Sequence, residues 1–144
     1  MSERTIRSIV EGQTLVTAPA TATVAEAARA MREARVGGLM VVDGDRLVGV
    51  FTERDALFRV VADGRDANVT RLADVMTCDP RTIHPDARFA QALELMHEGR
   101  FRHVPVVEDG RLVGMVSARD ALGPELEGFV YELLRQEQVD TILA

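Results

Sequence analysis

The stretch Leu47-Val48-Gly49-Val50-Phe51-Thr52-Glu53-Arg54-Asp55 has a related copy about 65 residues later, and such a repeat sets the architecture of the chain. The second copy reads Leu112-Val113-Gly114-Met115-Val116-Ser117-Ala118-Arg119-Asp120. In each copy an apolar strand with a glycine leads to a hydroxyl residue, and an aspartate follows three positions later. A hydroxyl and an acid at this spacing are typical of a helix start, where unpaired backbone amides can hold an anion. Two such points predict two related sites.

The composition is that of an ordinary globular domain. The chain has 144 residues, 47% hydrophobic and 28% charged, which is enough for one buried core. Its formal net charge of −6 argues against a nucleic-acid partner but leaves room for local arginines that bind phosphate. Residues 1–5 lack the parts of a signal peptide, and no apolar run approaches the roughly 20 residues of a membrane span. We therefore expect a soluble, cytoplasmic protein without a membrane partner.

The sequence predicts neither a metal site nor catalytic residues. The single cysteine, Cys78, cannot form an internal disulfide or a cysteine-based zinc site. His84, His97 and His103 share no ligand-like spacing. No phosphate-binding glycine loop and no nucleophile–base pair is recognisable, and the two motif aspartates lie in separate copies.

Each copy is expected to run strand, helix, strand, hairpin, strand, helix. In copy one, the pattern predicts strands at 15–17, 39–42 and 46–51, a helix at 24–34 capped by Thr23, and a helix from Thr52 to about Gly64. In copy two, it predicts strands at 82–83, 103–107 and 111–116 and a helix marked by Phe89, Ala92, Leu93 and Met96. The expected division is 1–64 for the first repeat with an entry helix, 65–73 for a linker, 74–122 for the second repeat and 123–144 for a C-terminal helix. The apolar stripe of that last helix has two open interpretations: it covers the body of its own chain, or it packs on a second subunit.

Taken together and in order, these motifs resemble a tandem pair of CBS domains (the module named after cystathionine β-synthase), often called a Bateman module. The resemblance covers roughly residues 5–122, and it also rests on 76–80 and on 101–107, which precedes the second hairpin. It implies an α/β (α+β) fold of two β-α-β-β-α repeats about a pseudo-twofold axis, with short N-terminal and C-terminal helices. It also implies a homodimer and two clefts that hold adenosine-containing ligands.

The resemblance also implies which residues line each cleft. In that family the motif aspartate takes the ribose hydroxyls, the Thr or Ser contacts ribose or phosphate, and strands of the other repeat form a wall for the base. The first cleft would use Val50, Thr52, Arg54, Asp55, Asp79, Arg81, Thr82, Phe101, Arg102 and His103. The second would use Met115, Ser117, Arg119, Asp120, Thr14, Val16, Thr17, Val36, Gly37 and Gly38.

The two clefts are not expected to be equivalent. Copy one has Val36-Gly37-Gly38 where copy two has Phe101-Arg102-His103, so one wall carries a ring, a guanidinium and an imidazole. We expect the Asp55 cleft to bind more tightly or to favour more phosphates, with Arg81 or Arg102 as charge partners. Met40 stands where the other copy has Pro105, which changes the shape of the Asp120 cleft.

The function these patterns favour is a non-enzymatic sensor for adenosine nucleotides. AMP and ATP lead, with ADP, NAD(H) and S-adenosylmethionine as further ligands; no cofactor is required, and the regulated partner protein is unknown. Two alternatives remain open: a dimeric structural adaptor with vestigial clefts, and a small enzyme. The Thr52 and Asp55 pair also fits a plain helix cap, and both roles can coexist.

Overall fold

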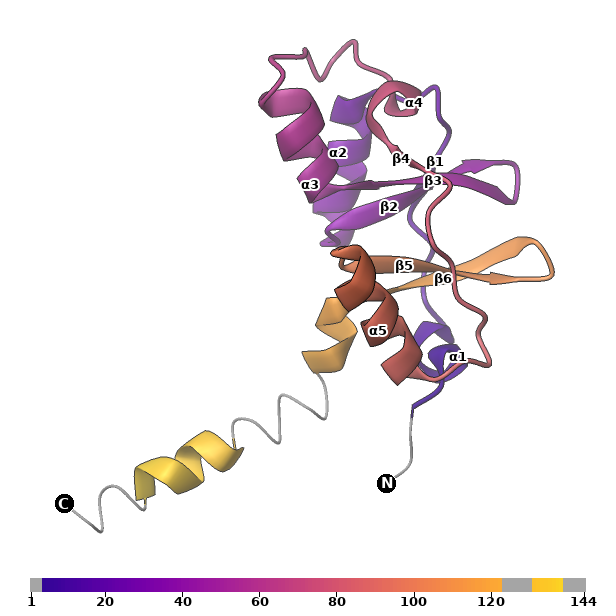
Figure 1. Cartoon of the computed structure of the whole chain (residues 1–144). Helices are drawn as coiled ribbons and strands as arrows, with labels where there is room; N and C mark the ends of the chain where they lie inside the picture. The colour runs from indigo at the N-terminus through magenta and orange to yellow at the C-terminus, as the bar shows by residue number, and fades with distance from the viewer. Residues whose placement is uncertain (1–3, 123–130, 139–144) are drawn as a thin grey trace.

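The computed structural model describes residues 4–122 and 131–138 (Figure 1). The first part of the chain forms α1 (Ile6–Val10), β1 (Thr17–Ala18), α2 (Val24–Ala34), β2 (Gly38–Asp43), β3 (Arg46–Thr52), α3 (Glu53–Asp55) and the π-helix η1 (Ala56–Val61). The second forms α4 (Leu72–Val75), β4 (Thr77–Cys78), α5 (Phe89–Gly99), β5 (His103–Glu108), β6 (Arg111–Ser117) and the 3-10 helix η2 (Ala118–Leu122). Residues 131–138 are helical and exposed; the rest of the predicted C-terminal helix lies outside the described residues.

The repeat in the sequence is a repeat in strand pairing. Strands β1 to β4 form one sheet in that order, and β5 pairs with β6. In the β2–β3 hairpin Met40 lies opposite Val50, and in the β5–β6 hairpin Pro105 lies opposite Met115. Both hairpins carry a register shift at the same position of the repeat. The predicted strand at 82–83 is a single bridge from Ile83 to Val106. The mixed α/β fold of two repeats is confirmed.

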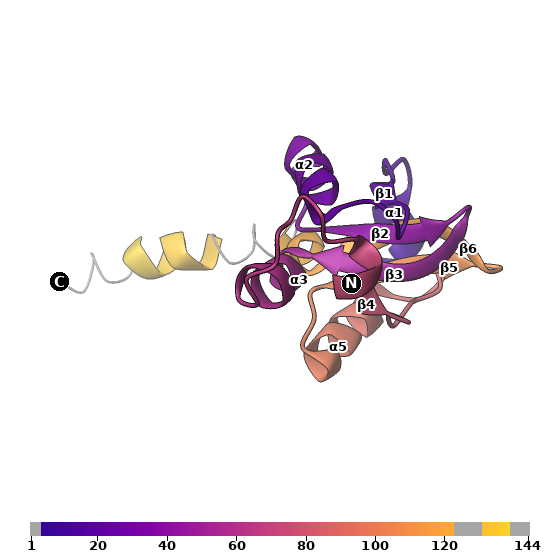
Figure 2. The same ribbon diagram turned by 90° about the horizontal axis from the view of Figure 1, so that it is seen from above.

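The two halves stack with their sheets facing the middle of the molecule, as Figure 1 shows. Both hairpins point to one side, and the view from above in Figure 2 shows α2, α3 and α5 gathered on the other. The long helices α2 and α5 begin with different N-cap residues, Thr23 and Arg88, but end alike. The Thr23 hydroxyl accepts a hydrogen bond from the Glu26 amide at the start of α2. Helices α2 and α5 both end at an arginine in the left-handed region, Arg35 and Arg100, each with φ 56°.

Each half has its own apolar core. Leu39 and Phe51 are fully buried against α2 in the first half, and Val104 and Val116 are fully buried against α5 in the second. Burial of such side chains contributes about 1.5–3 kcal/mol each. Each half is therefore stabilised by a core of its own.

The short helix before each repeat packs against the core of the other repeat. Ile6 and Val10 of α1 belong to the core of the second half, and the Ile6 amide donates to the Ala87 carbonyl at 2.9 Å. Leu72 and Val75 of α4 belong to the core of the first half. The chain therefore crosses between the halves at both junctions. The boundaries at residues 65–73 stay a prediction.

The helix after Thr52 differs from the expected α-helix. After one turn, α3 widens into η1, in which the Ala62 amide donates to the Leu57 carbonyl at 2.9 Å, five residues back. This winding leaves Leu57, Phe58 and Val61 exposed by 54%, 58% and 67%. None of the described helices is long and apolar enough to cross a membrane.

Candidate functional site

A cavity of about 800 Å³ lies between the two halves, at the C-terminal end of β3. Its lining includes nine of the ten residues predicted for the first cleft: Val50, Thr52, Arg54, Asp55, Asp79, Arg81, Phe101, Arg102 and His103. Thr82 lines an adjoining hollow of about 300 Å³, which shares Asp79 and Pro80 with the cavity. Because both halves contribute walls, a molecule in this cavity contacts both.

The structure adds lining residues that the sequence did not indicate. Leu57, Phe58 and Arg59 reach the cavity from η1, Thr77 from β4, and Arg100 from the end of α5. Leu57, Phe58 and Arg59 belong to the π-helix, and Arg100 is the left-handed residue after α5. Neither feature is marked by a sequence motif, so these four residues were not predicted. Thr77 was within reach of prediction, since it belongs to the 76–80 segment that carries the resemblance.

Asp55 is the most constrained polar side chain of the cavity. It is 6% exposed, and its Oδ2 accepts hydrogen bonds from the amide and hydroxyl of Thr52 at 3.0 and 3.2 Å. The Thr77 hydroxyl donates to its Oδ1 at 3.2 Å, and Arg59 Nε lies 3.7 Å from the same oxygen. The carboxylate is therefore fixed in one orientation by groups from three elements.

Three of the backbone amides at this helix start are bonded within the protein, and the expectation that such amides hold an anion stays a prediction. The Thr52 amide donates to Asp55, the Asp55 amide donates to the Thr52 hydroxyl at 3.3 Å, and the Glu53 amide donates to the Gly37 carbonyl at 3.0 Å. Thr52 and Asp55 thus form a complete capping box. The bonded amides of Thr52, Glu53 and Asp55 are not donors for an anionic ligand, so side chains of the cavity become the main candidates.

The motif arginines connect the two halves. Arg54 donates to the carbonyl of Arg100 at 2.7 Å, and its counterpart Arg119 donates to the carbonyl of Arg35 at 3.1 Å. Both acceptors are the left-handed residues that end the long helices. The same hydrogen bond between the halves therefore occurs twice. In the first case Arg54 fixes the backbone of Arg100, which lines the cavity.

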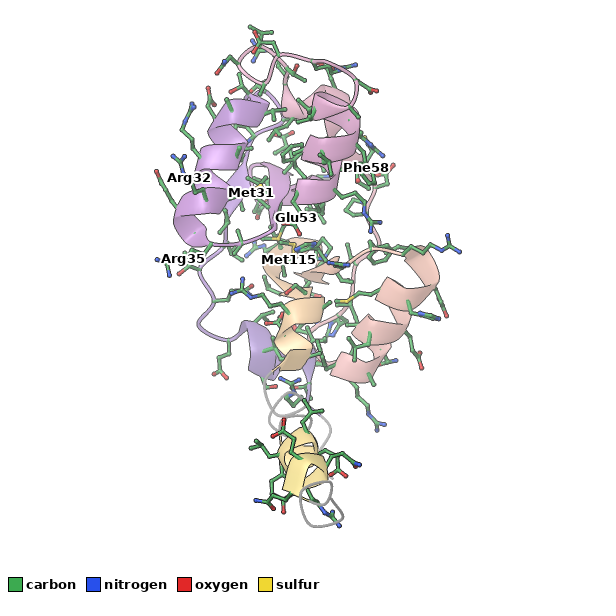
Figure 3. The ribbon with its side chains drawn as sticks, turned by 90° about the vertical axis from the view of Figure 1, so that its left-hand side faces the viewer. Met31, Arg32, Arg35, Glu53, Phe58 and Met115 are labelled. Atoms are coloured by element: carbon green, nitrogen blue, oxygen red, sulfur yellow. The ribbon has the colours of Figure 1, made fainter. Side chains whose placement is uncertain are left out.

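The surroundings of Asp120 differ from those of Asp55. The side-chain amide of Gln13 bonds to both the carbonyl and the amide of Met115, at 2.9 and 2.8 Å, in the place where β4 pairs with β3 in the first half. Asp120 accepts the Ser117 amide at 2.7 Å. A methyl group at Gly37 would lie 3.1 Å from the Glu53 carboxylate. Figure 3 shows Glu53 and Met115 near the boundary of the two halves.

The other residues predicted for the second cleft take several positions. Val16 and Val36 pack against the core of the first half, and Thr17 opens β1, where it lies opposite Met40. Gly38 lies beneath the ring of His103, since a methyl group there would be 3.2 Å from His103 Cδ2. Thr14 is exposed. Their role as a ligand wall stays a prediction.

Burial is the main effect on the pKa of His103, which it lowers from the ordinary value of 6.5. Glu53, Asp120 and Asp55 act in the opposite direction, and Arg102 acts in the same direction as burial. As the pH falls, the unfolded chain therefore binds a proton at this histidine before the folded chain does. The stability that comes from keeping His103 neutral is complete above pH 6.5 and is lost below it.

We expect the free energy of unfolding to fall less between pH 7.5 and 5.5 (about one unit either side of that value) in His103→Gln than in the wild type. Urea unfolding at the two pH values measures this. His97→Gln, on the exposed face of α5, is the control, and an unchanged pH slope in His103→Gln would contradict the assignment.

A second charged cluster lies away from the cavity. Ligand atoms of His84, Asp86 and Glu108 all lie within 4.8 Å of one another. Arg7 already bridges the two acids, with Nη2 at 2.9 Å from Asp86 and 2.6 Å from Glu108, and His84 Nδ1 accepts the Asp86 amide at 3.0 Å. Arg7 lowers the pKa of Glu108 through these bonds. The cluster is an ion network that ties α1 to the second half.

Comparison with known proteins agrees with this geometry. The model of the CBS domain matches residues 6–62 and 72–124. The mitochondrial CBS domain-containing protein CBSX3 of Arabidopsis thaliana is 36% identical over 105 residues, which cover 69% of this chain and 51% of that protein. The chain spans about half the length of this relative, and 22% of a longer Arabidopsis relative.

Solved structures show the same arrangement. A CBS-domain protein from Burkholderia ambifaria, described as a candidate signal-transduction protein, has 35% identity and a TM-score of 0.78, over 83% of this chain and 91% of that one. A CBS domain protein from Pyrobaculum aerophilum, solved in complex with AMP, has 29% identity and a TM-score of 0.77, over 92% of this chain and 99% of that one. With two repeats, two separate cores and a cavity between them, the chain belongs to the CBS-domain family, as a tandem pair.

Proposed function

We propose that this chain is a non-enzymatic regulatory module that binds an adenosine-containing nucleotide in the Asp55 cavity. The observation that carries the proposal is the fixed carboxylate of Asp55, buried in a cavity whose walls come from both halves. A carboxylate can accept both hydrogen bonds of a ribose cis-diol, and the apolar and aromatic side chains of Val50 and Phe101 suit a base. The AMP complex of the Pyrobaculum relative supports the same ligand class.

The regulatory part follows from the position of the cavity. A nucleotide that contacts β3 of one half and the start of β5 of the other favours one relative placement of the halves. It shifts that placement only by its difference in affinity for the alternatives. We propose that the protein acts as a homodimer and that this shift alters the surface offered to a partner protein. The exposed apolar side chains of η1, Leu57, Phe58 and Val61, are suited to such a surface.

The first test is to identify what the purified full chain carries. Mass spectrometry of the small molecules released on denaturation should detect an adenosine nucleotide. If none is carried, adding AMP, ADP, ATP, NAD(H) or S-adenosylmethionine should raise the melting temperature with at least one of them, because a ligand that binds only the folded state stabilises it. No released nucleotide and no shift with any of the five would favour the adaptor alternative.

A further inference from the structure

We infer that the Asp55 cavity selects nucleoside di- and triphosphates over monophosphates; this rests on the proposed function and names the class of ligand. The chain is acidic overall, with a formal charge of −6. Of its 17 basic residues, five arginines line this one cavity, against three carboxylates. The arginines are Arg54, Arg59, Arg81, Arg100 and Arg102, and the acids are Glu53, Asp55 and Asp79. The lining is therefore net positive on an acidic protein.

Two of these arginines are used by the fold. Arg54 donates to the Arg100 carbonyl, and Arg59 donates to the carbonyls of Val75 and Met76 at 3.3 and 2.9 Å. The guanidinium groups of Arg81, Arg100 and Arg102 make no hydrogen bond or ion pair with any residue that the structure describes. Three cationic groups that face one cavity without a partner are available to an anion.

These side chains are the donors that the backbone does not supply. The amides of Thr52, Glu53 and Asp55 at the start of α3 are bonded within the protein, so a phosphate cannot rely on these three. A guanidinium binds phosphate oxygens in a bidentate manner and stays charged. A phosphate monoester carries a charge of about −1.5 to −2 at neutral pH. One bidentate guanidinium is enough for one phosphate group, so three guanidinium groups without a partner provide donors for a di- or triphosphate.

The other half of the molecule provides an internal comparison. At the equivalent positions of the repeat it has Val16, Arg35 and Gly37 in place of Arg81, Arg100 and Arg102. The Glu53 carboxylate lies against Gly37. The same fold is therefore built with one arginine instead of three, so the set around the Asp55 cavity is not a requirement of the fold.

Isothermal titration of the full chain with AMP, ADP and ATP, without divalent cations, tests this selectivity. We expect ATP to bind at least about tenfold more tightly than AMP, with the difference shrinking as salt is added. Arg100→Gln and Arg102→Gln should each weaken ATP binding about fivefold and AMP binding less than twofold. Arg29→Gln, which removes an exposed arginine of α2, is the matched control and should change neither.

The outcomes separate this inference from the proposed function. Equal affinities for AMP and ATP, or equal losses for both in the arginine variants, would overturn the selectivity and leave nucleotide binding intact. If no nucleotide binds at all, the proposed function fails. Titration with inorganic triphosphate completes the experiment. We expect it to bind more weakly than ATP; if it binds as tightly as ATP, the cavity is an anion site that does not recognise the nucleoside.

Discussion

Replacing Asp55 with alanine is expected to weaken the binding of AMP and ATP by about a hundredfold or more. Hydrogen bonds to a charged group contribute about 1.5–3 kcal/mol each, and a ribose diol makes two of them to one carboxylate. About 1.4 kcal/mol corresponds to a factor of ten in affinity. Asp55 is also held in place before the ligand arrives, by Thr52 and Thr77. Isothermal titration with the purified variant measures the loss.

The control for this variant is its counterpart in the repeat. Asp120→Ala removes an equivalent helix cap, since Asp120 accepts the Ser117 amide as Asp55 accepts the Thr52 amide. Each cap contributes about 1 kcal/mol to stability, so both variants should unfold at somewhat lower urea concentration. Only Asp55→Ala should lose nucleotide affinity in the cavity described above. Wild-type affinity in Asp55→Ala would place the ligand elsewhere.

Gly49→Ala is expected to destabilise the protein by about 1–3 kcal/mol and to weaken nucleotide binding as well. A methyl group at Gly49 would lie 2.9 Å from the Thr77 carbonyl oxygen and 2.6 Å from Met76 Sδ. The sulfur can move aside, but the carbonyl belongs to β4, which pairs with β3 at this point. If β4 is pushed away, the Thr77 hydroxyl moves away from Asp55. Urea unfolding and titration with ATP measure the two effects.

Gly114→Ala separates packing from binding. A methyl group at Gly114 would lie 2.7 Å from Val10 Cβ and 2.9 Å from Gln13 Oε1, so the loss of stability should be similar. Val10 and Gln13, the residues that this methyl group would meet, do not line the Asp55 cavity, and affinity there should stay at the wild-type value. Equal losses of affinity in the two variants would mean that general loosening, and not the displacement of Thr77, weakens binding.

Much of the first cleft could be predicted from the sequence, because its motif residues recur at a fixed spacing. Thr52 and Asp55 lie at the end of a strand and the start of a helix, as Ser117 and Asp120 do in the other copy, and the structure places Thr52 and Asp55 in the cavity. Their role toward a ligand stays a prediction. Thr82 was assigned to the same wall and lines the adjoining hollow, three residues beyond Asp79, whose φ is 46°.

The local and repeated features could be predicted from the sequence: helix α2 with its cap at Thr23, the two hairpins and the recurrence of the motif. These depend on residues a few positions apart, so their signals can be seen along the chain. Three features became visible only in the folded chain: α1 packs into the second half, Gln13 bonds to the backbone of Met115, and Arg100 lines the same cavity as Asp55. Each of these contacts joins residues far apart in the chain. Which partner such a residue meets depends on how the two cores stack, and no local pattern carries that information.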